Sequence, residues 1–419
     1  MKTAILEIND QNLLLRAEDG ELFVQPGFAN VTANGIETGE EARAVAWREP
    51  QASYNEYWRQ LNQVTLPTTH VWARHHADIA FAQLKQILTS ANSPERLIIA
   101  VPGSFSDDQL SLLSGLADAF PTKIEALVDT ALAACVDQRE SNVLVELQLH
   151  QAIVSLITRS DEKMIVSQQE VIPNIGVLHI YNSIARHISE TLIKNYRYDP
   201  LHTSEGEQAI YDQMSGWLMR LRWEDNIAIK LPSPQGELTL QLQKSNIDKI
   251  LRQRLSNLKA AIQKHIDVTL IFSHSAILIP TLFKEYADTE VLLLSSAIEN
   301  CARLEQRLKG SELHRITSLE NIDTPKTKGK ISPKVTHLAH DGHAHSLSQP
   351  LSVEIVSGQL YITNDINNAA AFVAVLENQK LKILKQKADL KIKLPNHFKP
   401  GEFIHLADNK LQLIEVVDG

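Results

Sequence analysis

One stretch in the first third of the sequence constrains the fold most. Arg96–Val101, in which five apolar residues follow one arginine, is of the kind found in buried strands, and a Pro-Gly-Ser sequence ends it. Ser106, followed three residues later by Gln109, is typical of the start of a capped helix. A second apolar run at Ile124–Val128 precedes a short helical stretch. Strands and helices that alternate in this order predict an α/β unit.

Further strand and helix patterns lie on both sides of this unit. Near the N-terminus, short apolar segments and an Asp-Gly turn predict strands at 4–8, 13–15 and 22–24. Apolar residues at helical spacing predict helix over 54–90. Beyond Asn142, short runs joined by tight turns predict an antiparallel meander of strands at 143–147, 152–157 and 163–166.

The middle of the chain combines long helices with short strands. Periodicity predicts two long helices, at 176–196 and 204–221, and then a hairpin of 226–231 with 237–242. Ser245, with Asp248 three residues later, predicts the capped start of one helix that runs to about His265. The remaining expected elements are a strand at 268–272, a short helix opened by Pro280 and a strand at 291–294.

The composition changes after about residue 310. Residues 311–348 hold prolines, lysines, serines and five histidines with little periodicity, so we expect a linker there. From 349 to 419 apolar and polar residues alternate, which predicts a small all-β domain. We therefore divide the chain into lobes at 1–140 and 141–310, a linker at 311–348 and a β domain at 349–419.

Composition and charge exclude several classes of protein. With 419 residues, 43% of them apolar, the chain can bury the cores of more than one domain. A net charge of -9 argues against a dedicated nucleic-acid binder, which usually carries a basic face. No apolar run reaches the roughly 20 residues of a membrane helix, so we expect no membrane insertion. The N-terminus does not resemble a signal peptide, and two distant cysteines fit buried thiols, so we expect a cytoplasmic protein.

Two segments of the α/β unit resemble those of DnaK-type (heat-shock-seventy) chaperones. Val101–Gln109 reads V-P-G-S-F-S-D-D-Q, similar to that family's "VPAYF" region, and Asp129–Ala134 follows where the family has "NEPTAAA". Gly39, Ala42 and Pro50 resemble an earlier element of the same family. The resemblance covers about residues 1–305 in order. It implies a two-lobed actin-like ATPase fold built of duplicated ribonuclease-H-like subdomains.

The family's ATPase chemistry depends on two glycine-rich loops, and both lack glycine in this chain. In the family, backbone N–H groups of these loops approach the phosphate oxygens so closely that a Cβ would interfere. The first loop aligns with Glu7-Ile8-Asn9-Asp10-Gln11, the second with Glu146–Gln151, and the adenosine loop with Phe272–Ser275. Asn9, Gln148, Ser273 and Ser275 therefore occupy the positions that would contact a nucleotide.

Carboxylates remain at three positions where the resemblance implies catalytic ones. They are Glu7, Asp129 and Glu146. In the family such groups hold hydrated magnesium and orient the attacking water. One interpretation is that they still bind ATP with magnesium; the other is that they are structural and that Gln148, Leu149 and His150 fill the cleft. We favour the second, because these side chains would obstruct the phosphates, and we expect no cofactor.

The densest group of metal-binding residue types lies in the expected linker. His337, His340, His343 and His345 could bind zinc or nickel as neutral imidazoles. No cysteine lies beside them and no helix fixes their geometry, so a polar connection is the alternative.

These patterns lead to one functional hypothesis and its alternative. We expect a non-catalytic scaffold or assembly adaptor that binds a protein partner through the cleft, the loop at 198–208 or the C-terminal β domain. The alternative is a divergent ATP-dependent chaperone or an actin-like ATPase that forms filaments, in which Glu7, Asp129 and Glu146 act as the catalytic groups. Homo-oligomers are compatible with both, and we expect no nucleic-acid partner.

Overall fold

The computed structural model divides into two units, Met1–Asp323 and Thr324–Gly419, which are treated separately below. The structure describes residues 3–68, 71–286, 289–308 and 314–321 of the first unit. In the second unit it describes 335–340, 343–347, 351–356, 359–363, 372–377, 380–386, 392–393, 400–406 and 409–414. The chain is of the mixed α/β type, with small antiparallel sheets near the C-terminus.

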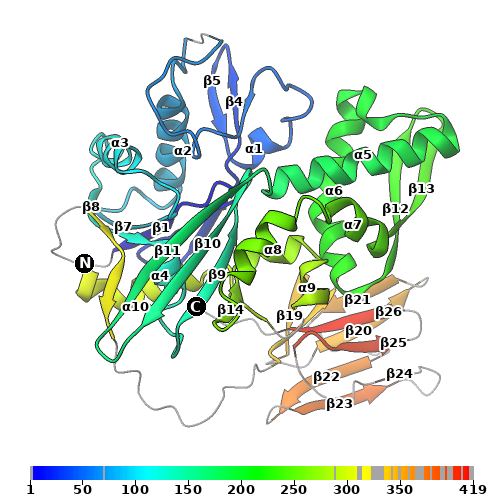
Figure 1. Ribbon diagram of the computed structural model, residues 1–419. Coiled ribbons are helices and arrows are strands. Elements are labelled where there is room, and N and C mark those ends of the chain that lie inside the picture. Colours follow the sequence, from blue (N-terminus) through cyan, green and yellow to red (C-terminus); the bar gives the residue numbers. More distant parts are fainter. Residues whose placement is uncertain are drawn as a thin grey trace. The chain divides into compact units, whose positions relative to one another are not determined.

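The first sheet contains the α/β pattern read from the sequence (Figure 1). In spatial order its strands are β16 (Arg315–Ile316), β8 (Lys123–Asp129), β7 (Arg96–Val101), β1 (Ala4–Glu7), β2 (Leu13–Arg16) and β3 (Leu22–Gln25). β1, β7, β8 and β16 are parallel, whereas β2 and β3 are antiparallel to their neighbours. The predicted N-terminal strands and the predicted strand-helix-strand unit are confirmed.

The second sheet repeats the strand order of the first. Its strands are β15 (Glu290–Val291), β14 (Thr269–Phe272), β9 (Asn142–Leu147), β10 (Gln151–Arg159), β11 (Lys163–Pro173) and β17 (Ser318–Glu320). β9, β10 and β11 form the predicted antiparallel meander, and β14 and β15 lie parallel on its other side. Thus β11-β10-β9-β14-β15 corresponds, strand for strand and direction for direction, to β3-β2-β1-β7-β8.

Alternating side chains divide the first unit into three cores. In β1, Ala4 and Leu6 face α2 (His76–Ser90) and α3 (Asp107–Ala117), whereas Ile5 points to the opposite face, as a period of two requires. That opposite face contains α4 (Thr130–Ala134) and α10 (Ser296–Leu308), which pack against residues of both sheets. On the outer face of the second sheet, α8 (Ser256–Gln263) packs against β10 and β11. α5 (Val177–Tyr196), α6 (Ser204–Trp223) and α7 (Lys244–Leu251) share the same core and lie beside the sheet (Figure 1).

The first unit has two halves, one around the first sheet and one around the second, and smaller elements extend each of them. β4 (Ala29–Thr32), β5 (Gly35–Thr38) and β6 (Ser53–Tyr54) form a three-stranded sheet, and α1 (Glu40–Arg43) follows β5. The predicted hairpin is β12 (Asn226–Ser233) with β13 (Gly236–Gln243). The remaining short helices are η1 (Pro200–His202), η2 (His274–Leu278) and α9 (Leu282–Glu285).

Two helix predictions are wrong in extent. Helix over 54–90 forms only from His76 onward, because Thr65 bridges to His75 and the His75 and Asp78 side chains then cap the new helix. In place of the single helix expected from Ser245, the structure has two helices, α7 and α8. Ser245 lies inside α7, whose N-cap is Gln243. Arg254 lies in the interruption, where its guanidinium bonds to Ser183 and to the carbonyl of Asn174.

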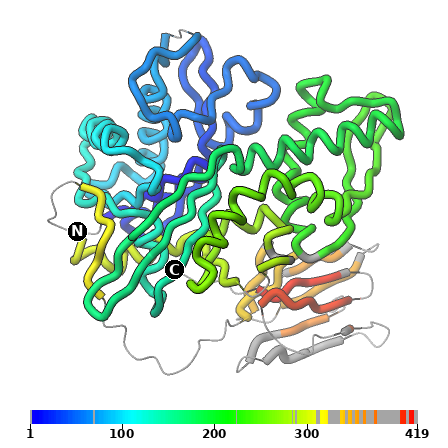
Figure 2. The backbone as a smooth tube through the Cα atoms, viewed as in Figure 1, coloured from blue at the N-terminus to red at the C-terminus, as the bar shows by residue number. Residues whose placement is uncertain are grey.

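The region expected to be a linker contributes strands to both sheets of the first unit. β16 pairs with β8 at the edge of one sheet, and after a single residue β17 pairs with β11 at the edge of the other. Figure 2 shows this yellow segment running beside the strands that it extends. The guanidinium of Arg315 donates to the carbonyls of Gly103 at 3.1 Å and Phe105 at 3.3 Å, which fixes the segment to the loop after β7.

The second unit contains two antiparallel sheets. One has the order β19 (His343–Ser346), β18 (His337–His340), β26 (Asn409–Ile414), β25 (Phe403–Leu406) and β24 (Ile392–Lys393). The other has the order β21 (Gln359–Thr363), β20 (Leu351–Val356), β22 (Phe372–Glu377) and β23 (Lys380–Gln386). Leucine, valine and phenylalanine side chains from both sheets form one core, among them Leu338, Val353 and Phe372.

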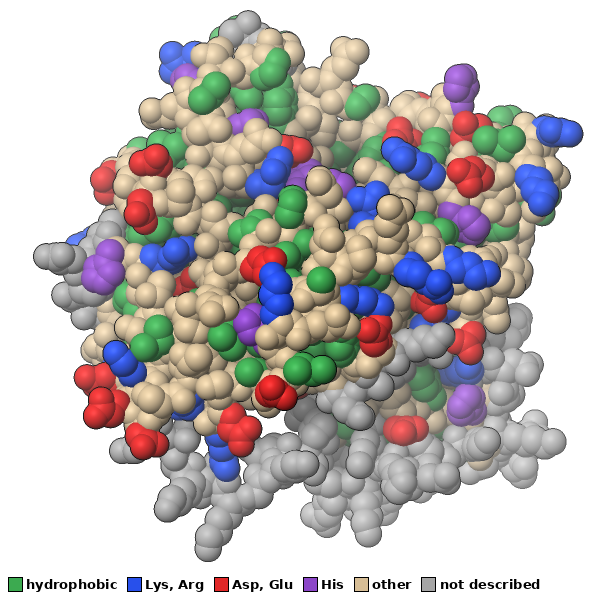
Figure 3. Space-filling model, in the orientation of Figure 1, with side chains coloured by type: hydrophobic (Ala, Val, Ile, Leu, Met, Phe, Trp, Pro, Cys, Tyr) green, Lys and Arg blue, Asp and Glu red, His purple; other side chains and the backbone are tan. Residues whose placement is uncertain are grey.

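The described surface mixes charges of both signs. On the face drawn in Figure 3, acidic and basic side chains are interspersed over the first unit. None of the helices in the described part of the chain combines the length and the apolar character that crossing a membrane requires. Both cysteines are buried free thiols, as their spacing predicts.

Candidate functional site

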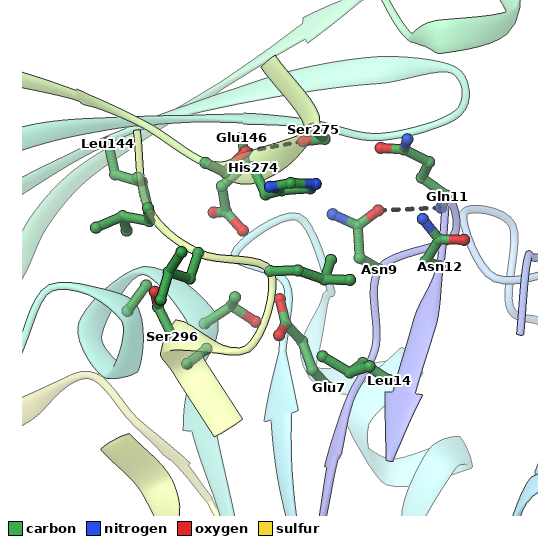
Figure 4. A pocket seen from close by; sticks show the side chains of 17 residues that line it. Glu7, Asn9, Gln11, Asn12, Leu14, Leu144, Glu146, His274, Ser275 and Ser296 are labelled. Atoms are coloured by element: carbon green, nitrogen blue, oxygen red, sulfur yellow. Dashed lines mark hydrogen bonds between the residues drawn. The ribbon is translucent and has the colours of Figure 1, made fainter. Parts of the chain in front are cut away.

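The two sheets bring the ends of β1 and β9 together around a small cavity of about 50 Å³. Glu7 is the last residue of β1, and Glu146 is the penultimate residue of β9. Their carboxyl groups enter the cavity from opposite sides (Figure 4). The polar residues that complete its lining are Asn9, Gln11, Asn12, Thr130, Ser273, His274, Ser275 and Ser296.

These two carboxyl groups are held in an environment that disfavours their charge. Burial raises the pKa of Glu7 to about 7. Burial, followed by the charges of Asp129 and Glu7, raises the pKa of Glu146 well above its usual range. Oε2 of each group, like Oγ1 of Thr130, is shielded from solvent and has no hydrogen-bond partner among the residues that the structure describes. The cavity therefore disfavours the ionised form of both carboxyl groups.

Asp129, the third carboxylate, has partners of its own outside the cavity. It caps α4 by accepting from the N–H of Ala131 at 3.0 Å. The amide of Gln169 donates to both of its carboxylate oxygens, at 3.1 and 3.3 Å, and Arg315 lies 4.0 Å away. Burial nevertheless raises its pKa, and the nearby Arg315 reduces that shift. Asp129 therefore acts on Glu146 through charge and forms no part of the cavity lining.

Backbone groups of the turn between β9 and β10 form hydrogen bonds with other groups of the protein. Gln148 donates its N–H to the carbonyl of Gln151 at 2.9 Å, and its own carbonyl accepts from the N–H of Val177 at 2.9 Å. The N–H of Leu149 donates to Oδ1 of Asp10 at 2.7 Å. A Cβ on Gly176 would lie 2.3 Å from the backbone of Leu149, so glycine there allows α5 to begin directly against this turn.

Asp10 is the site residue that the sequence reasoning missed. It lies in the first loop, is 3% exposed, and its backbone carbonyl accepts from Gly27 at 3.0 Å. Burial raises the pKa of its side chain to about 7, although the Leu149 hydrogen bond and the charge of Arg59 favour the ionised form. Beside it, Oδ1 of Asn9 accepts from the N–H of Gln11 at 3.0 Å, which forms a tight Asx turn.

Ser273 and Ser275 tie η2 to the end of β9. The N–H of Ser273 donates to the carbonyl of Val145 at 2.9 Å, and the hydroxyl of Ser275 accepts from the N–H of Leu147 at 3.2 Å. The two hydroxyls are 2.8 Å apart. Both residues line the cavity, so the structure brings them to Glu7, Asn9 and Glu146.

A larger cavity of about 250 Å³ adjoins the first and shares Gln11, Asn12, His274, Ser275 and Leu294 with it. Four aromatic residues line it: Phe28, Trp47, Tyr181 and Tyr211. The rings of Trp47 and Tyr211 stack across the two halves of the unit, with centroids 4.0 Å apart and planes at 18°. The charge of Arg43, which also lines the cavity, is compensated by Glu40 and by Asp212 at 3.8 Å.

The segment 198–208, expected as a partner-contact loop, is tied down at both ends. Oδ1 of Asp199 accepts from the hydroxyl of Ser189 at 2.6 Å and from the N–H of Leu201 at 3.0 Å. Gln208 is fully buried, accepts from the N–H of Trp47 at 3.0 Å and donates to the carbonyl of Arg43 at 3.1 Å. Gln208, the last residue of this segment, thus joins α6 to the first half of the unit.

The histidines considered for a metal lie on a hairpin of the second unit. β18 and β19 pair His340 with His343 and Leu338 with His345. Residues three apart on a strand point to opposite faces, so His337 and His340 do not converge. The side chain of His343 lies outside the described residues. Within the part of the chain that the structure describes, no group of three or more His, Cys, Asp or Glu side chains could hold a metal ion.

No family model matches the chain, and no curated protein matches its sequence.

Proposed function

We propose that this chain is a divergent two-lobed actin-like protein of the DnaK kind that acts without nucleotide, as a scaffold or assembly adaptor for a protein partner. The repeated strand order of the two sheets supports the fold assignment, because that fold is a duplication of one subdomain. Glu7 and Glu146 support it too, since they stand near the ends of corresponding strands, β1 and β9. The Val101–Gln109 sequence favours the chaperone branch.

The observation that carries the proposal is the hydrogen bond from the N–H of Leu149 to Asp10. In a working phosphate loop, this N–H group would be directed at the ligand. Here a carboxyl group from the first loop takes the place of a phosphate oxygen. Leu149 is itself buried, and its side chain occupies space that a glycine would leave open. The Leu149 N–H in the second loop and the Asp10 carboxyl group in the first therefore satisfy each other's hydrogen-bonding capacity.

Contacts between the two halves favour a closed form that needs no ligand. Gln208 joins α6 to the backbone at Arg43 and Trp47, and Trp47 stacks on Tyr211. At the rim of the cavities, Met219, Leu293 and Leu294 are 45%, 61% and 40% exposed. Large exposed apolar side chains of this kind are typical of contact surfaces. We propose the cleft rim, the 198–208 segment and the second unit as the surfaces for the partner.

Calorimetric titration of ATP and ADP with magnesium, together with thermal unfolding at about 1 mM nucleotide, tests the proposal. A site with a Kd of about 10 µM would add about 2.7 kcal/mol under these conditions, which shifts the unfolding temperature measurably. We expect neither heat nor shift. Micromolar binding with magnesium-dependent turnover would remove the proposal.

The alternative is a divergent ATP-dependent chaperone or a filament-forming ATPase. It is favoured by the adjoining cavities of about 50 and 250 Å³ between the halves, and by the retained carboxyl groups of Glu7 and Glu146. If Glu146→Ala changed neither nucleotide affinity nor turnover, this alternative would fail. Sedimentation over a concentration series, with and without nucleotide, tests filament formation.

A further inference from the structure

The first sheet ends at β3, and no strand in the described part of the chain pairs with the outer edge of β3. The next pair along its register with β2 is Ala17 with Glu21, and the N–H of Ala17 donates to the carbonyl of Glu21 at 2.8 Å. Bonded and non-bonded pairs alternate along an antiparallel ladder, so the backbone of Phe23 is also bonded to β2. Leu22 and Val24 therefore direct their backbone N–H and C=O groups away from β2, toward the free edge.

The same two residues also expose apolar side chains. Leu22 is 44% exposed and Val24 is 48% exposed. Natural edge strands usually carry a lysine, a proline or a bulge that prevents pairing with another chain. β3 reads Leu-Phe-Val-Gln, without a charged residue, and its register with β2 is regular. The edge of β3 thus combines free backbone groups with exposed apolar side chains, which is what the addition of a strand requires.

The corresponding edge of the second sheet shows how such an edge is filled. β11 is the counterpart of β3, and β17 adds to β11 in antiparallel orientation. In that pairing Leu319 lies opposite Met164, which is 1% exposed. Among the described residues, the chain supplies no such strand to β3. By analogy, the strand that would cover β3 should be antiparallel to it and should bring apolar side chains.

β3 is complementary to a second copy of itself. In a two-fold antiparallel pairing centred on Phe23, Leu22 of one copy lies opposite Val24 of the other. The outward N–H and C=O groups of both residues then form hydrogen bonds across the pair. Glu21 lies opposite Gln25 in this register, so no like charges face each other. A second copy therefore supplies both the antiparallel orientation and the apolar side chains.

Neighbouring two-fold registers lose part of these contacts. A pairing centred on Val24 sets Leu22 against Pro26, which has no N–H to donate. A pairing centred on Leu22 sets Val24 against Gly20, whose N–H already donates to the carbonyl of Ala17 at 3.0 Å. The strand and its flanking residues thus favour the register centred on Phe23.

We propose that β3 is a self-association site through which two copies of this chain join their six-stranded first sheets into one continuous sheet. The two copies use the same surface, so the assembly closes as a dimer. A pair of four-residue strands is a small interface, and complexes that bury less than roughly 1,200 Å² are transient, so we expect a Kd on the order of 10–100 µM. This dimer does not depend on what the cleft between the halves binds.

Sedimentation of the full chain from about 1 to 300 µM tests the proposal. We expect wild type to shift from monomer to dimer over this range and to grow no further. Val24→Lys places a charge on the edge, as natural edge strands do, and should weaken the dimer more than about tenfold. Val171→Lys is the matched control, because Val171 lies on the counterpart strand β11 and is 40% exposed. This variant should dimerise as wild type does.

Amide hydrogen exchange distinguishes strand pairing from contact through side chains alone. The N–H groups of Leu22 and Val24 should exchange several-fold more slowly at the highest protein concentration than at the lowest. The N–H of Phe23 is already bonded to β2, so its exchange should not depend on concentration. Val24→Lys should remove the concentration dependence at Leu22.

Two single cysteine variants, Leu22→Cys and Val24→Cys, test the register. Directly opposite Cα atoms lie about 5.5 Å apart, within reach of a disulfide, whereas diagonal neighbours lie about 7–8 Å apart. An equal mixture of the two variants should therefore form a linked dimer on oxidation, and either variant alone should form much less. Both native cysteines are buried and should not interfere.

Several results would overturn the proposal. One is a wild type that stays monomeric at every concentration, which would leave the β3 edge to a strand of another protein. Another is a dimer that Val24→Lys does not weaken, or that Val171→Lys weakens equally. A third is a dimer in which the N–H groups of Leu22 and Val24 exchange as fast as in the monomer.

Discussion

Oδ1 of Asp10 lies 2.7 Å from the backbone nitrogen of Leu149, a residue 139 positions further along the chain. This hydrogen bond joins the loop after β1 to the turn after β9, at corresponding positions of the two repeated sheets. Because the carboxyl group is part of the same molecule, any external anion competes with a partner of high effective concentration. Under the proposed function, this internal contact stands where a phosphate loop would contact its ligand.

Two substitutions of Asp10 should distinguish the contribution of its hydrogen bond to stability from the contribution of its charge. Asp10→Asn keeps an oxygen that can accept from Leu149, and it avoids the ionisation of a group whose pKa burial raises to about 7. Its free energy of unfolding at pH 8 should equal or exceed that of wild type. Asp10→Ala leaves the Leu149 N–H without its partner and should cost about 1–3 kcal/mol. Urea denaturation measures both, and equal losses for Asn and Ala would contradict this account.

The buried carboxyl group of Glu7 should make the first unit less stable in alkaline solution. A carboxyl group with a raised pKa contributes stability below its ordinary value of 4.5, and this is lost as the pH rises through about 7. Glu7→Gln should therefore gain stability relative to wild type at pH 8, on the order of 1–3 kcal/mol, and gain little at pH 4.5. Denaturation at both pH values measures the difference.

The exposed Glu37 on β5 provides the control for this experiment. Glu37→Gln should leave the pH dependence of unfolding unchanged. A gain for Glu7→Gln that is the same at both pH values would show that size or packing, and not ionisation, is responsible.

Gln208 should hold the halves together through its two backbone contacts. Gln208→Ala leaves the Trp47 N–H and the Arg43 carbonyl without their partner, and we expect a loss of about 1–3 kcal/mol with faster exchange of the Trp47 amide. Gln213, on the exposed face of the same helix, bonds only to the carbonyl of Ala209 in its own helix. Gln213→Ala should change stability by less than about 0.5 kcal/mol. Similar losses for the two variants would refute the role of Gln208.

Arg315 should stabilise the loop after β7. Its guanidinium donates to the carbonyls of Gly103 and Phe105 and lies 4.0 Å from Asp129, so Arg315→Ala should cost about 1–3 kcal/mol in thermal or urea unfolding. For comparison, Arg96→Ala removes an ion pair of 3.9 Å with Glu125 near the surface and should cost no more than about 1 kcal/mol. The prediction fails if Arg96→Ala is the more damaging change.

Local patterns predicted those elements whose boundaries are set by nearby residues. Ser106 and Gln109 form the capping box that their spacing indicates, and the alternation in β1 separates Leu6 from Ile5 as expected. The start of α2 was missed because its cap is His75, an unusual residue at that position. α10 was overlooked although Ile298, Cys301 and Leu304 follow helical spacing, so that signal was available.

The candidate site could be predicted only in part. Resemblance located Glu7, Glu146 and Ser275, and the structure places all three around one cavity. Asp10 was overlooked because an aspartate in a short loop reads as a turn residue, and its partner at Leu149 is far away in sequence. The pairing of β16 and β17 was missed for the same reason: strands of two or three residues have no period to detect.

The short strands β16 and β17 also determine where the chain can be truncated to give a fragment of the first unit. A recombinant fragment that stopped at residue 310 would lack both, leaving the outer backbone groups of β8 and β11 bare on two separate sheets. Bare sheet edges recruit strands from other molecules. Such a fragment should precipitate or form mixed oligomers, whereas one that ends after Asn321 keeps both edges covered, so the choice of boundary decides whether the first unit can be studied alone.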